Sequence, residues 1–211
     1  MWPKDIIKMD ICRKLIVVTG PSACGKTFFA NKLLKKIGKN RCSIISQDNY
    51  YKDWGNLDIE KRKKINFDDI KAFDLSLFKK HLQALKDGKS ILRPYYDFVR
   101  SARLKKTKRI YPKPVIIVEG LMPLAKRSLI NFFDFKIYIE ADNATCLARR
   151  IKRDTRERGD SIESACRRYF QDVLPMQKKY VEPQKKLADI VIDTDKKLDD
   201  RLWDGIIKHI I

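Results

Sequence analysis

The stretch Gly20-Pro-Ser-Ala-Cys-Gly-Lys-Thr27 decides the fold of this chain. It satisfies the pattern G-x-x-x-x-G-K-[ST], which marks a loop that binds phosphate groups. A short apolar, β-branched run precedes it at residues 14–19, and a segment with apolar residues at helical spacing follows it at residues 28–37. A strand, a glycine-rich loop and a helix N-terminus together form an anion cradle, because backbone N–H groups and the helix dipole both favour phosphate oxygens.

Each residue of this loop has an expected part in binding ATP and Mg²⁺. Glycines permit the tight backbone path, Lys26 reaches the β- and γ-phosphates, and Thr27 ligates the metal. The expected nucleotide-binding residues in and beside the loop are Gly20, Ser22, Ala23, Cys24, Gly25, Lys26, Thr27 and Phe28. Because Cys24 lies inside the loop, we expect its alkylation to block nucleotide binding.

The remaining sequence alternates short apolar runs with longer helical patterns. Further strands are expected at residues 43–46, 115–118, 135–139 and 189–193, and helices at 74–86, 142–157, 162–181 with a break near Pro175, and 198–210. This alternation predicts an α/β, P-loop NTPase fold with a parallel sheet of about five strands and helices on both faces. Residues 90–94 and 108–111 are expected to pair as a small inserted β-hairpin, within one domain spanning residues 1–211.

Composition restricts the classes of function. Lys and Arg number 47 against 27 Asp and Glu, for a net charge of +20. That excess predicts attraction to anions, although a lysine-rich solvated surface explains much of it. Five cysteines without C-x-x-C spacing favour a reducing compartment. The first ten residues carry acids and resemble no secretory signal, and no apolar run approaches the roughly 20 residues of a membrane span. We expect a cytoplasmic protein without membrane contact.

Three acidic residues follow predicted strands, where ligands of a parallel sheet bind. Asp48 and Glu119 stand where a catalytic base and a Walker-B-type metal ligand are needed for phosphoryl transfer. Asp142 fits a helix N-cap better. Five arginines occupy one helical stretch, and we expect Arg149, Arg150 and Arg153 to share a broad face that stabilises the transferring phosphoryl group. The alternative for Asp48 and Glu119 is a role as turn or N-cap residues. The alternative for the arginines is a solvated face paired with Asp154 and Glu157.

The ordered segments resemble the uridine–cytidine kinases, within the phosphoribulokinase/uridine kinase group of P-loop kinases. The resemblance runs from about Leu15 to Asp193, nearly the whole chain. The segments that carry it are Ile45-Ser-Gln-Asp-Asn-Tyr-Tyr-Lys52, Asn66-Phe-Asp68, Ala72-Phe-Asp74, Pro94-Tyr-Tyr-Asp-Phe98, Val118-Glu-Gly120, and Arg149-Arg150 with Arg153-Asp154 and Glu157-Arg-Gly159. A phosphate loop alone is unspecific, whereas this ordered set is far more specific.

The resemblance implies roles for individual residues. Asp48 resembles the general base for the nucleoside 5′-hydroxyl and lies close to the metal ligands Thr27 and Glu119. The implied catalytic residues are Asp48, Lys26, Arg150 and Arg153. The implied substrate-binding residues are Asp48, Tyr51, Asp68 (ribose), Tyr96 and Phe98 (base), Arg150 and Arg168. Arg158 joins the nucleotide-binding residues in a lid at about 149–168, and the nucleoside-binding hairpin spans about 90–112.

Three positions near the nucleoside depart from the family pattern. A hairpin histidine that recognises the pyrimidine is Ser101 here, a lid arginine is Asp160, and a glutamine is Arg168. ATP-dependent phosphorylation of uridine or cytidine at the 5′-hydroxyl remains the leading expectation. A kinase for another nucleoside or small hydroxyl metabolite, a basic P-loop protein acting on nucleic acid, and an inactive regulatory relative are the alternatives. Specific nucleic-acid binding is not expected, since no added module is present; the resemblance implies a homodimer or homotetramer.

Overall fold

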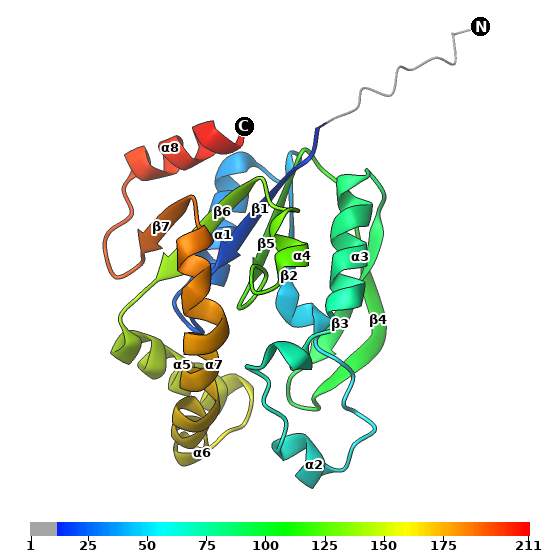
Figure 1. The fold of residues 1–211 in the computed structure, drawn as a ribbon, viewed down its shortest axis with the longest axis vertical. Helices are drawn as coiled ribbons and strands as arrows, with labels where there is room; N and C mark the ends of the chain where they lie inside the picture. Colours follow the sequence, from blue (N-terminus) through cyan, green and yellow to red (C-terminus); the bar gives the residue numbers. More distant parts are fainter. Residues whose placement is uncertain (1–11) are drawn as a thin grey trace, which may run out of the picture.

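A five-stranded parallel sheet forms the centre of the molecule, as Figure 1 shows. The computed structural model describes residues 12–211; the expected absence of a secretory signal concerns residues outside this range. The strand order is β2-β5-β1-β6-β7. The strands are β1 Lys14–Thr19, β2 Cys42–Ser46, β5 Val115–Gly120, β6 Phe135–Glu140 and β7 Ile190–Asp193. The predicted α/β sheet is therefore confirmed, with strands close to their expected bounds.

The register of the sheet gathers the carboxyl ends of the strands at one edge. Thr19 at the end of β1 lies opposite Gly120 of β5 on one side and Tyr138 of β6 on the other. Ser46 at the end of β2 lies opposite Glu119 of β5. The segments that leave β1, β2 and β5 consequently begin beside one another, which positions the site described below.

Helices cover both faces of the sheet, because alternate strand residues point to opposite sides. Ile16 and Val18 pack against α1 Lys26–Ile37 and α8 Asp200–Ile210. Leu15 and Val17 pack against α3 Leu75–Lys86 and α4 Arg127–Ile130. The rings of Phe29 in α1 and Trp203 in α8 stack at 4.7 Å. Each large apolar side chain buried this way contributes on the order of 2 kcal/mol.

The strands of the inserted hairpin are longer than predicted. Its strands are β3 Ile91–Asp97 and β4 Ala102–Ile110, so the aromatic segment lies mainly inside β3 rather than between the strands. The register shifts between Pro94 and Tyr95, which accommodates a proline that cannot donate to the ladder. Arg103 of β4 anchors the hairpin, since its Nε donates to the Tyr51 carbonyl at 2.8 Å.

The helical segments after β6 lie across the site from the hairpin, at the same end of the sheet. Asp142 caps α5 Asn143–Glu157 by accepting from the Ala144 N–H at 2.8 Å, which confirms its reading as an N-cap. After α6 Ile162–Arg168 the chain stays helical through short segments at Tyr169–Val173, Leu174–Met176 (α7), Gln177–Val181 and Glu182–Leu187. The predicted break near Pro175 is instead a change to wider π-type turns, which tolerate the missing proline N–H.

Several short helices were not predicted, because they are too short to show a period. They are Gln47–Tyr50, α2 Ile59–Lys63, Ile70–Ala72 and α4. Between residues 12 and 211 no helix combines the length and apolar character that crossing a membrane requires.

Candidate active site

The phosphate loop connects β1 directly to α1. Gly20 has a φ of 148°, and a Cβ there would lie 2.0 Å from the carbonyl oxygen of Ile139 in the neighbouring strand. Gly25 has a φ of 99°, in the left-handed region that favours glycine. Gly25 also lacks a side chain that could cap α1. The first N–H groups of α1 therefore stay available to phosphate oxygens.

The side chains around this loop point in different directions. Lys26 is buried, and its Nζ donates to the carbonyl of Pro21 at 2.5 Å, which holds the ammonium against the loop. Phe28 is 70% exposed. The Sγ–H of Cys24 points into the core toward the Ile139 carbonyl at 3.4 Å, and burial raises the pKa of the thiol. The thiol is fully buried, so an alkylating reagent does not reach it while the protein stays folded.

A cavity of about 600 Å³ opens beside the start of α1. Its lining includes Gly25, Phe28, Lys32, Arg149, Thr194, Lys196, Lys197 and Leu198. Arg149 faces this cavity and donates to Asp195 at 3.4 Å, so it does not share a face with Arg150 as we expected. Sequence reasoning also missed the segment after β7, although its position at a strand's carboxyl end was an available signal. An aromatic ring among cations suits the base of a nucleotide whose phosphates lie in the loop.

Two carboxylates and one hydroxyl gather at the ends of β2 and β5. The Oγ1 of Thr27 donates to Glu119 Oε2 at 3.2 Å. Asp48 lies in the short helix after β2, and its N–H donates to Ser46 Oγ at 3.3 Å. Burial raises the pKa of Glu119, and the negative charge of Asp48 raises it further. A cation at this point would therefore offset an unfavourable concentration of negative charge.

This donor set fits Mg²⁺. Residues 12–211 hold no group of three His, Cys, Asp or Glu side chains arranged for a metal. Magnesium, however, is usually bound through one or two carboxylates together with substrate phosphates and water, rather than by an all-protein cage. Thr27 and Glu119, with Asp48 nearby, provide oxygen ligands of the right chemistry next to the phosphate loop.

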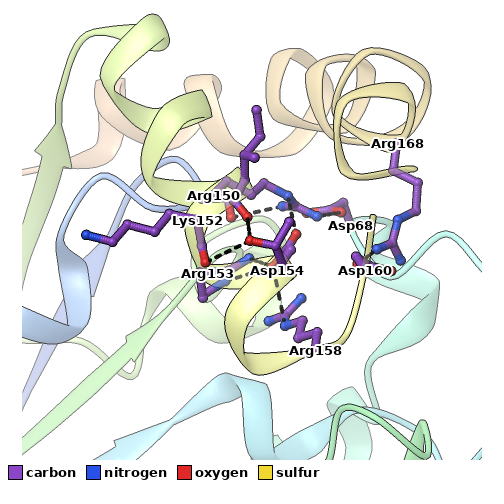
Figure 2. Close-up of polar contacts among 11 residues, drawn as sticks. Asp68, Arg150, Lys152, Arg153, Asp154, Arg158, Asp160 and Arg168 are labelled. Carbon is purple, nitrogen blue, oxygen red and sulfur yellow. Dashed lines mark hydrogen bonds and ion pairs between the residues drawn. The ribbon is translucent and has the colours of Figure 1, made fainter. Parts of the chain in front are cut away.

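One arginine connects the phosphate loop to a carboxylate on the far wall. Arg150 donates from Nη1 to Ser22 Oγ at 2.9 Å. Its two terminal nitrogens also donate to Asp68 Oδ1 and Oδ2, both at 3.1 Å (Figure 2). Arg150 and Asp68 are 6% and 7% exposed. The fork geometry of guanidinium matches a carboxylate, so this bidentate pair is rigid as well as charged.

Asp154 forms ion pairs with three arginines, including Arg150, and was not predicted as a site residue. Its side chain is 1% exposed and pairs with Arg150 at 3.2 Å, Arg153 at 2.8 Å and Arg158 at 3.5 Å. Figure 2 shows the three guanidinium groups arranged around this carboxylate. Burial acts to raise the pKa of Asp154, but the three cations outweigh burial and lower it. The expected ion pairs with Asp154 are present; its carboxylate is buried, while the side chains of Arg153 and Arg158 are partly exposed.

A second cavity, of about 380 Å³, lies between the hairpin turn and α5–α6. Its lining includes Tyr51, Phe67, Asp68, Tyr96, Phe98, Arg150, Arg158, Asp160, Arg168 and Asp172. The rings of Tyr96 and Phe98 meet edge to face at 5.3 Å, and Tyr51 packs on Tyr96 at 5.2 Å. Arg158 lies over the Phe98 ring at 4.7 Å. Flat aromatic walls beside a carboxylate suit a planar heterocycle attached to a diol.

The three departures from the family pattern meet in this cavity. Ser101, in the hairpin turn, has a φ of 52° and lines the cavity with Asp160 and Arg168. Asp160 and Arg168 form an ion pair with each other, apart from the three arginines that surround Asp154 (Figure 2). The tertiary structure thus brings together Asp160 and Arg168, which the sequence showed only as two separate departures from the family pattern.

Comparison with known proteins supports the same family as the resemblance. The model of the "Phosphoribulokinase / Uridine kinase family" matches residues 15–199. The chain is 42% identical over 178 residues to the uridine kinase of Clostridium novyi, covering 84% of this chain and 86% of that protein. It is 40% identical over 182 residues to the uridine kinase of Salmonella paratyphi B, covering 84% and 85%.

Solved structures agree on the fold. The phosphoribulokinase from Rhodobacter spheroides superposes with a TM-score of 0.58 at 14% identity, covering 81% of this chain and 68% of that one. At that identity the likeness concerns the fold alone, and the family rests on the sequence matches. Because the family model covers residues 15–199 and relatives are 40–42% identical over 84% of its length, this chain belongs to the phosphoribulokinase/uridine kinase family.

Proposed function

We propose that this protein transfers the γ-phosphoryl group of ATP to the 5′-hydroxyl of uridine or cytidine, giving the nucleoside 5′-monophosphate. The observation that carries the proposal is the position of Arg150, which bridges Ser22 of the phosphate loop and Asp68 of the aromatic cavity. An acceptor bound at Asp68 lies next to phosphates bound in the loop. The uridine kinases that are 40–42% identical to it over 84% of the chain support the choice of acceptor.

The acceptor cavity provides one group for each part of a ribonucleoside. Asp68 accepts hydrogen bonds from the two hydroxyls of the ribose diol, which favours ribose over 2′-deoxyribose. Tyr96 and Phe98 pack against the base, and Tyr51, whose ring contacts both, lines the same cavity. Burial of Tyr51 raises the pKa of its phenol well above the usual value, as do the charges of Asp48 and Asp68, so the hydroxyl stays protonated as a donor.

Asp48 removes the proton from the attacking hydroxyl. As the O5′–phosphorus bond forms, the bond between the γ-phosphorus and the β–γ bridging oxygen breaks, and ADP leaves with that oxygen. The 5′-hydroxyl proton goes to the Asp48 carboxylate. Positive charge from Lys26, Arg150 and Arg153 offsets the negative charge on the transferring group. Mg²⁺, held through Thr27 and Glu119, neutralises the phosphates when bound.

The cavity at Phe28 accommodates the adenosine part of ATP. Phe28 offers an aromatic face, and Lys32, Arg149 and Lys196 place positive charge around it. For Arg158, in the lid at about 149–168, nucleotide binding is proposed on the family resemblance alone, since in the structure it lies over the Phe98 ring at the acceptor cavity. The net charge of +20 favours the anionic nucleotide.

We place the reaction in the cytoplasm, where ATP and nucleosides are present and cysteines stay reduced. All five cysteines are free thiols, and three of them, Cys24, Cys42 and Cys146, are buried. We further propose a homodimer or homotetramer, as the family resemblance implies. Light scattering of the purified protein measures that state, and a monomer at assay concentration would contradict it.

A coupled assay of ADP release tests the activity. With Mg·ATP, we expect turnover with uridine and cytidine, little with thymidine, and none in a blank without acceptor. Turnover only with adenosine, or only with another hydroxyl metabolite, would show that the protein is a kinase but that the proposed acceptor is wrong. Nucleotide binding without turnover of any acceptor would contradict the proposal as a whole. Oligonucleotide binding near physiological salt would instead support the nucleic-acid alternative.

A further inference from the structure

We propose that Arg103 is a positioning residue for phosphoryl transfer, which fixes the short helix that carries Asp48 to the hairpin that carries Tyr96. The inference rests on the proposed function, because it concerns transfer to an acceptor bound at the hairpin. Among the described residues, those that line the two cavities do not include Arg103. Its effect on the reaction therefore passes through the residues that it holds.

The guanidinium of Arg103 holds the end of the helix that carries the proposed base. Its Nε donates to the carbonyl of Tyr51 at 2.8 Å, and its Nη2 donates to the carbonyl of Tyr50 at 3.4 Å. Tyr50 is the last residue of the short helix Gln47–Tyr50, here called the Asp48 helix. Because both acceptors are main-chain carbonyls, these contacts fix the backbone of the Asp48 helix relative to β4.

The main chain of the same arginine belongs to the acceptor hairpin. Arg103 lies opposite Tyr96 in the ladder between β3 and β4. The ring of Tyr96 lines the acceptor cavity and meets the ring of Phe98 at 5.3 Å. The backbone of Arg103 therefore moves with the aromatic wall of the cavity, while its side chain moves with the Asp48 helix.

A carboxylate at the start of α3 gives the guanidinium a fixed orientation. Nη1 and Nη2 of Arg103 both donate to Asp74 Oδ2 at 3.1 Å. Asp74 also caps α3 by accepting from the Leu77 N–H at 3.0 Å, and its own N–H donates to the Tyr50 carbonyl at 2.8 Å. The hairpin lies beside α3, as Figure 1 shows. Charge-assisted hydrogen bonds of this kind are stronger than neutral ones, so Arg103 is held against a helix that packs on the sheet.

This connection matters because transfer depends on where the acceptor hydroxyl lies relative to Asp48. A displacement of the reacting groups by about 1 Å can cost about 100-fold in rate. The hairpin positions the base of the acceptor, and the Asp48 helix positions the carboxylate. Arg103 determines the relation between the two. A role in stability alone explains less, because the side chains of Arg103 and Asp74 are 21% and 30% exposed and such pairs add little stability.

A second arginine of the hairpin also reaches the Asp48 helix. Arg93 of β3 donates from Nη1 to Asn49 Oδ1 at 2.6 Å. This contact holds a side chain, which rotates about its own bonds, whereas Arg103 holds two backbone carbonyls. We therefore assign the positioning role to Arg103.

Steady-state kinetics of Arg103→Met with uridine and Mg·ATP test the inference. We expect kcat to fall about tenfold while the KM for uridine changes less than about twofold, because the binding surfaces remain and only their alignment is lost. Calorimetric titration with nucleotide counts the folded, binding-competent protein to which kcat is referred. An unchanged kcat, or a KM that rises while kcat stays constant, would overturn the inference.

Arg109→Met is the matched control, since it makes the same change on the same strand at an exposed arginine that donates to Ser90. This control should keep the wild-type kcat. Arg103→Lys keeps the charge but not the fork and should give an intermediate kcat. If Arg103→Met does not fold, Asp74→Asn provides a milder change, which keeps a cap for α3 and removes the charge behind Arg103. A wild-type kcat in both Arg103→Lys and Asp74→Asn would then overturn the inference.

A double-mutant cycle with Tyr96→Leu separates positioning from a general loss of rigidity. If Arg103 acts by aligning the hairpin with the Asp48 helix, it has less to align once the Tyr96 ring is gone. The double variant should then lose less kcat than the product of the two single losses. Losses that multiply would show that Arg103 acts independently of the aromatic wall, which contradicts the proposed role.

The two proposals fail differently. If wild-type protein phosphorylates uridine and Arg103→Met does so with the same kcat, only the positioning role is wrong. If wild-type protein phosphorylates no nucleoside, the proposed function is wrong and the positioning role falls with it.

Discussion

Asp68 receives both terminal nitrogens of Arg150 at 3.1 Å, while the same guanidinium donates to Ser22 of the phosphate loop at 2.9 Å. A single cation therefore belongs to the acceptor cavity and to the phosphate loop at once. An acceptor diol that engages Asp68 changes the surroundings of Arg150, and through it the charge facing the phosphates. The carboxylate of Asp154 lies 3.2 Å from Nε of Arg150. This contact keeps the guanidinium in place while an acceptor binds at Asp68.

Replacing Arg150 by Lys should reduce kcat/KM for uridine by about 100-fold, because an ammonium cannot keep the bidentate contact to Asp68 and the contact to Ser22 together. Steady-state kinetics measure the loss. Arg156→Lys is the matched control, since Arg156 is exposed on the same helix. Equal losses in both variants would show that Arg150 acts only through the net charge of α5.

Replacing Asp48 by Asn should lower kcat by about 10²- to 10⁴-fold while leaving the affinity for ATP nearly unchanged, because the amide cannot accept the 5′-hydroxyl proton. Rapid-quench kinetics and calorimetric titration with nucleotide measure the two quantities. Asp69→Asn makes the same chemical change at a turn, where Asn also accepts the Lys71 N–H. Wild-type turnover in Asp48→Asn would remove Asp48 as the base.

Replacing Thr27 by Val should raise the Mg²⁺ concentration for half-maximal activity about tenfold, because the hydroxyl that contacts Glu119 at 3.2 Å is lost. Thr27→Ser keeps the hydroxyl and should stay close to wild type. Activity should disappear on chelation of the metal and return when Mg²⁺ is restored. An unchanged Mg²⁺ dependence in Thr27→Val would exclude Thr27 as a ligand.

Replacing Asp68 by Asn should lower kcat/KM for uridine about 100-fold and for 2′-deoxyuridine much less, because only the ribose diol presents two hydroxyls to the carboxylate. The ratio of the two substrates within each protein is the readout, which removes any effect shared by both. A constant ratio would mean that Asp68 serves only to hold Arg150.

Replacing Asp154 by Asn should destabilise the protein by about 3 kcal/mol at pH 7, because it leaves three arginines around an uncharged amide. The pKa of Asp154 is lowered in the folded state, so its stabilisation is present above the unfolded value of about 3.9 and is lost as the pH falls through the folded pKa.

The difference in stability between wild type and Asp154→Asn should therefore shrink as the pH falls below about 4. Chemical denaturation across a pH series measures it. Glu157→Gln removes an exposed acid one turn away on α5 and should change stability little at any pH. A difference that does not depend on pH would show that Asp154 acts through packing alone.

Most of the sheet and the phosphate loop could be predicted from the sequence, because their signals are local. The apolar run of β1, the glycines of the loop and the periodic face of α1 lie within one continuous stretch, residues 14–37. Glu119 and Asp48 could be placed at one edge because parallel strands end together. The two strands of the hairpin were predicted too short, because polar strands such as β4 carry little periodic signal.

Contacts between distant residues were decided only by the tertiary structure. Arg150 meets Ser22 across 128 residues and Asp68 across 82, and no local pattern encodes either distance. Helical spacing led us to expect Arg149 and Arg150 on one face. In the structure Arg149 faces the cavity beside Phe28, whereas Arg150 faces the cavity that contains Asp68. The sequence determined which chemical groups are present and which strand ends carry them. Folding decided which of these groups are buried together, since desolvation of Asp154 and Asp68 is tolerated only where arginines from the same wall reach them.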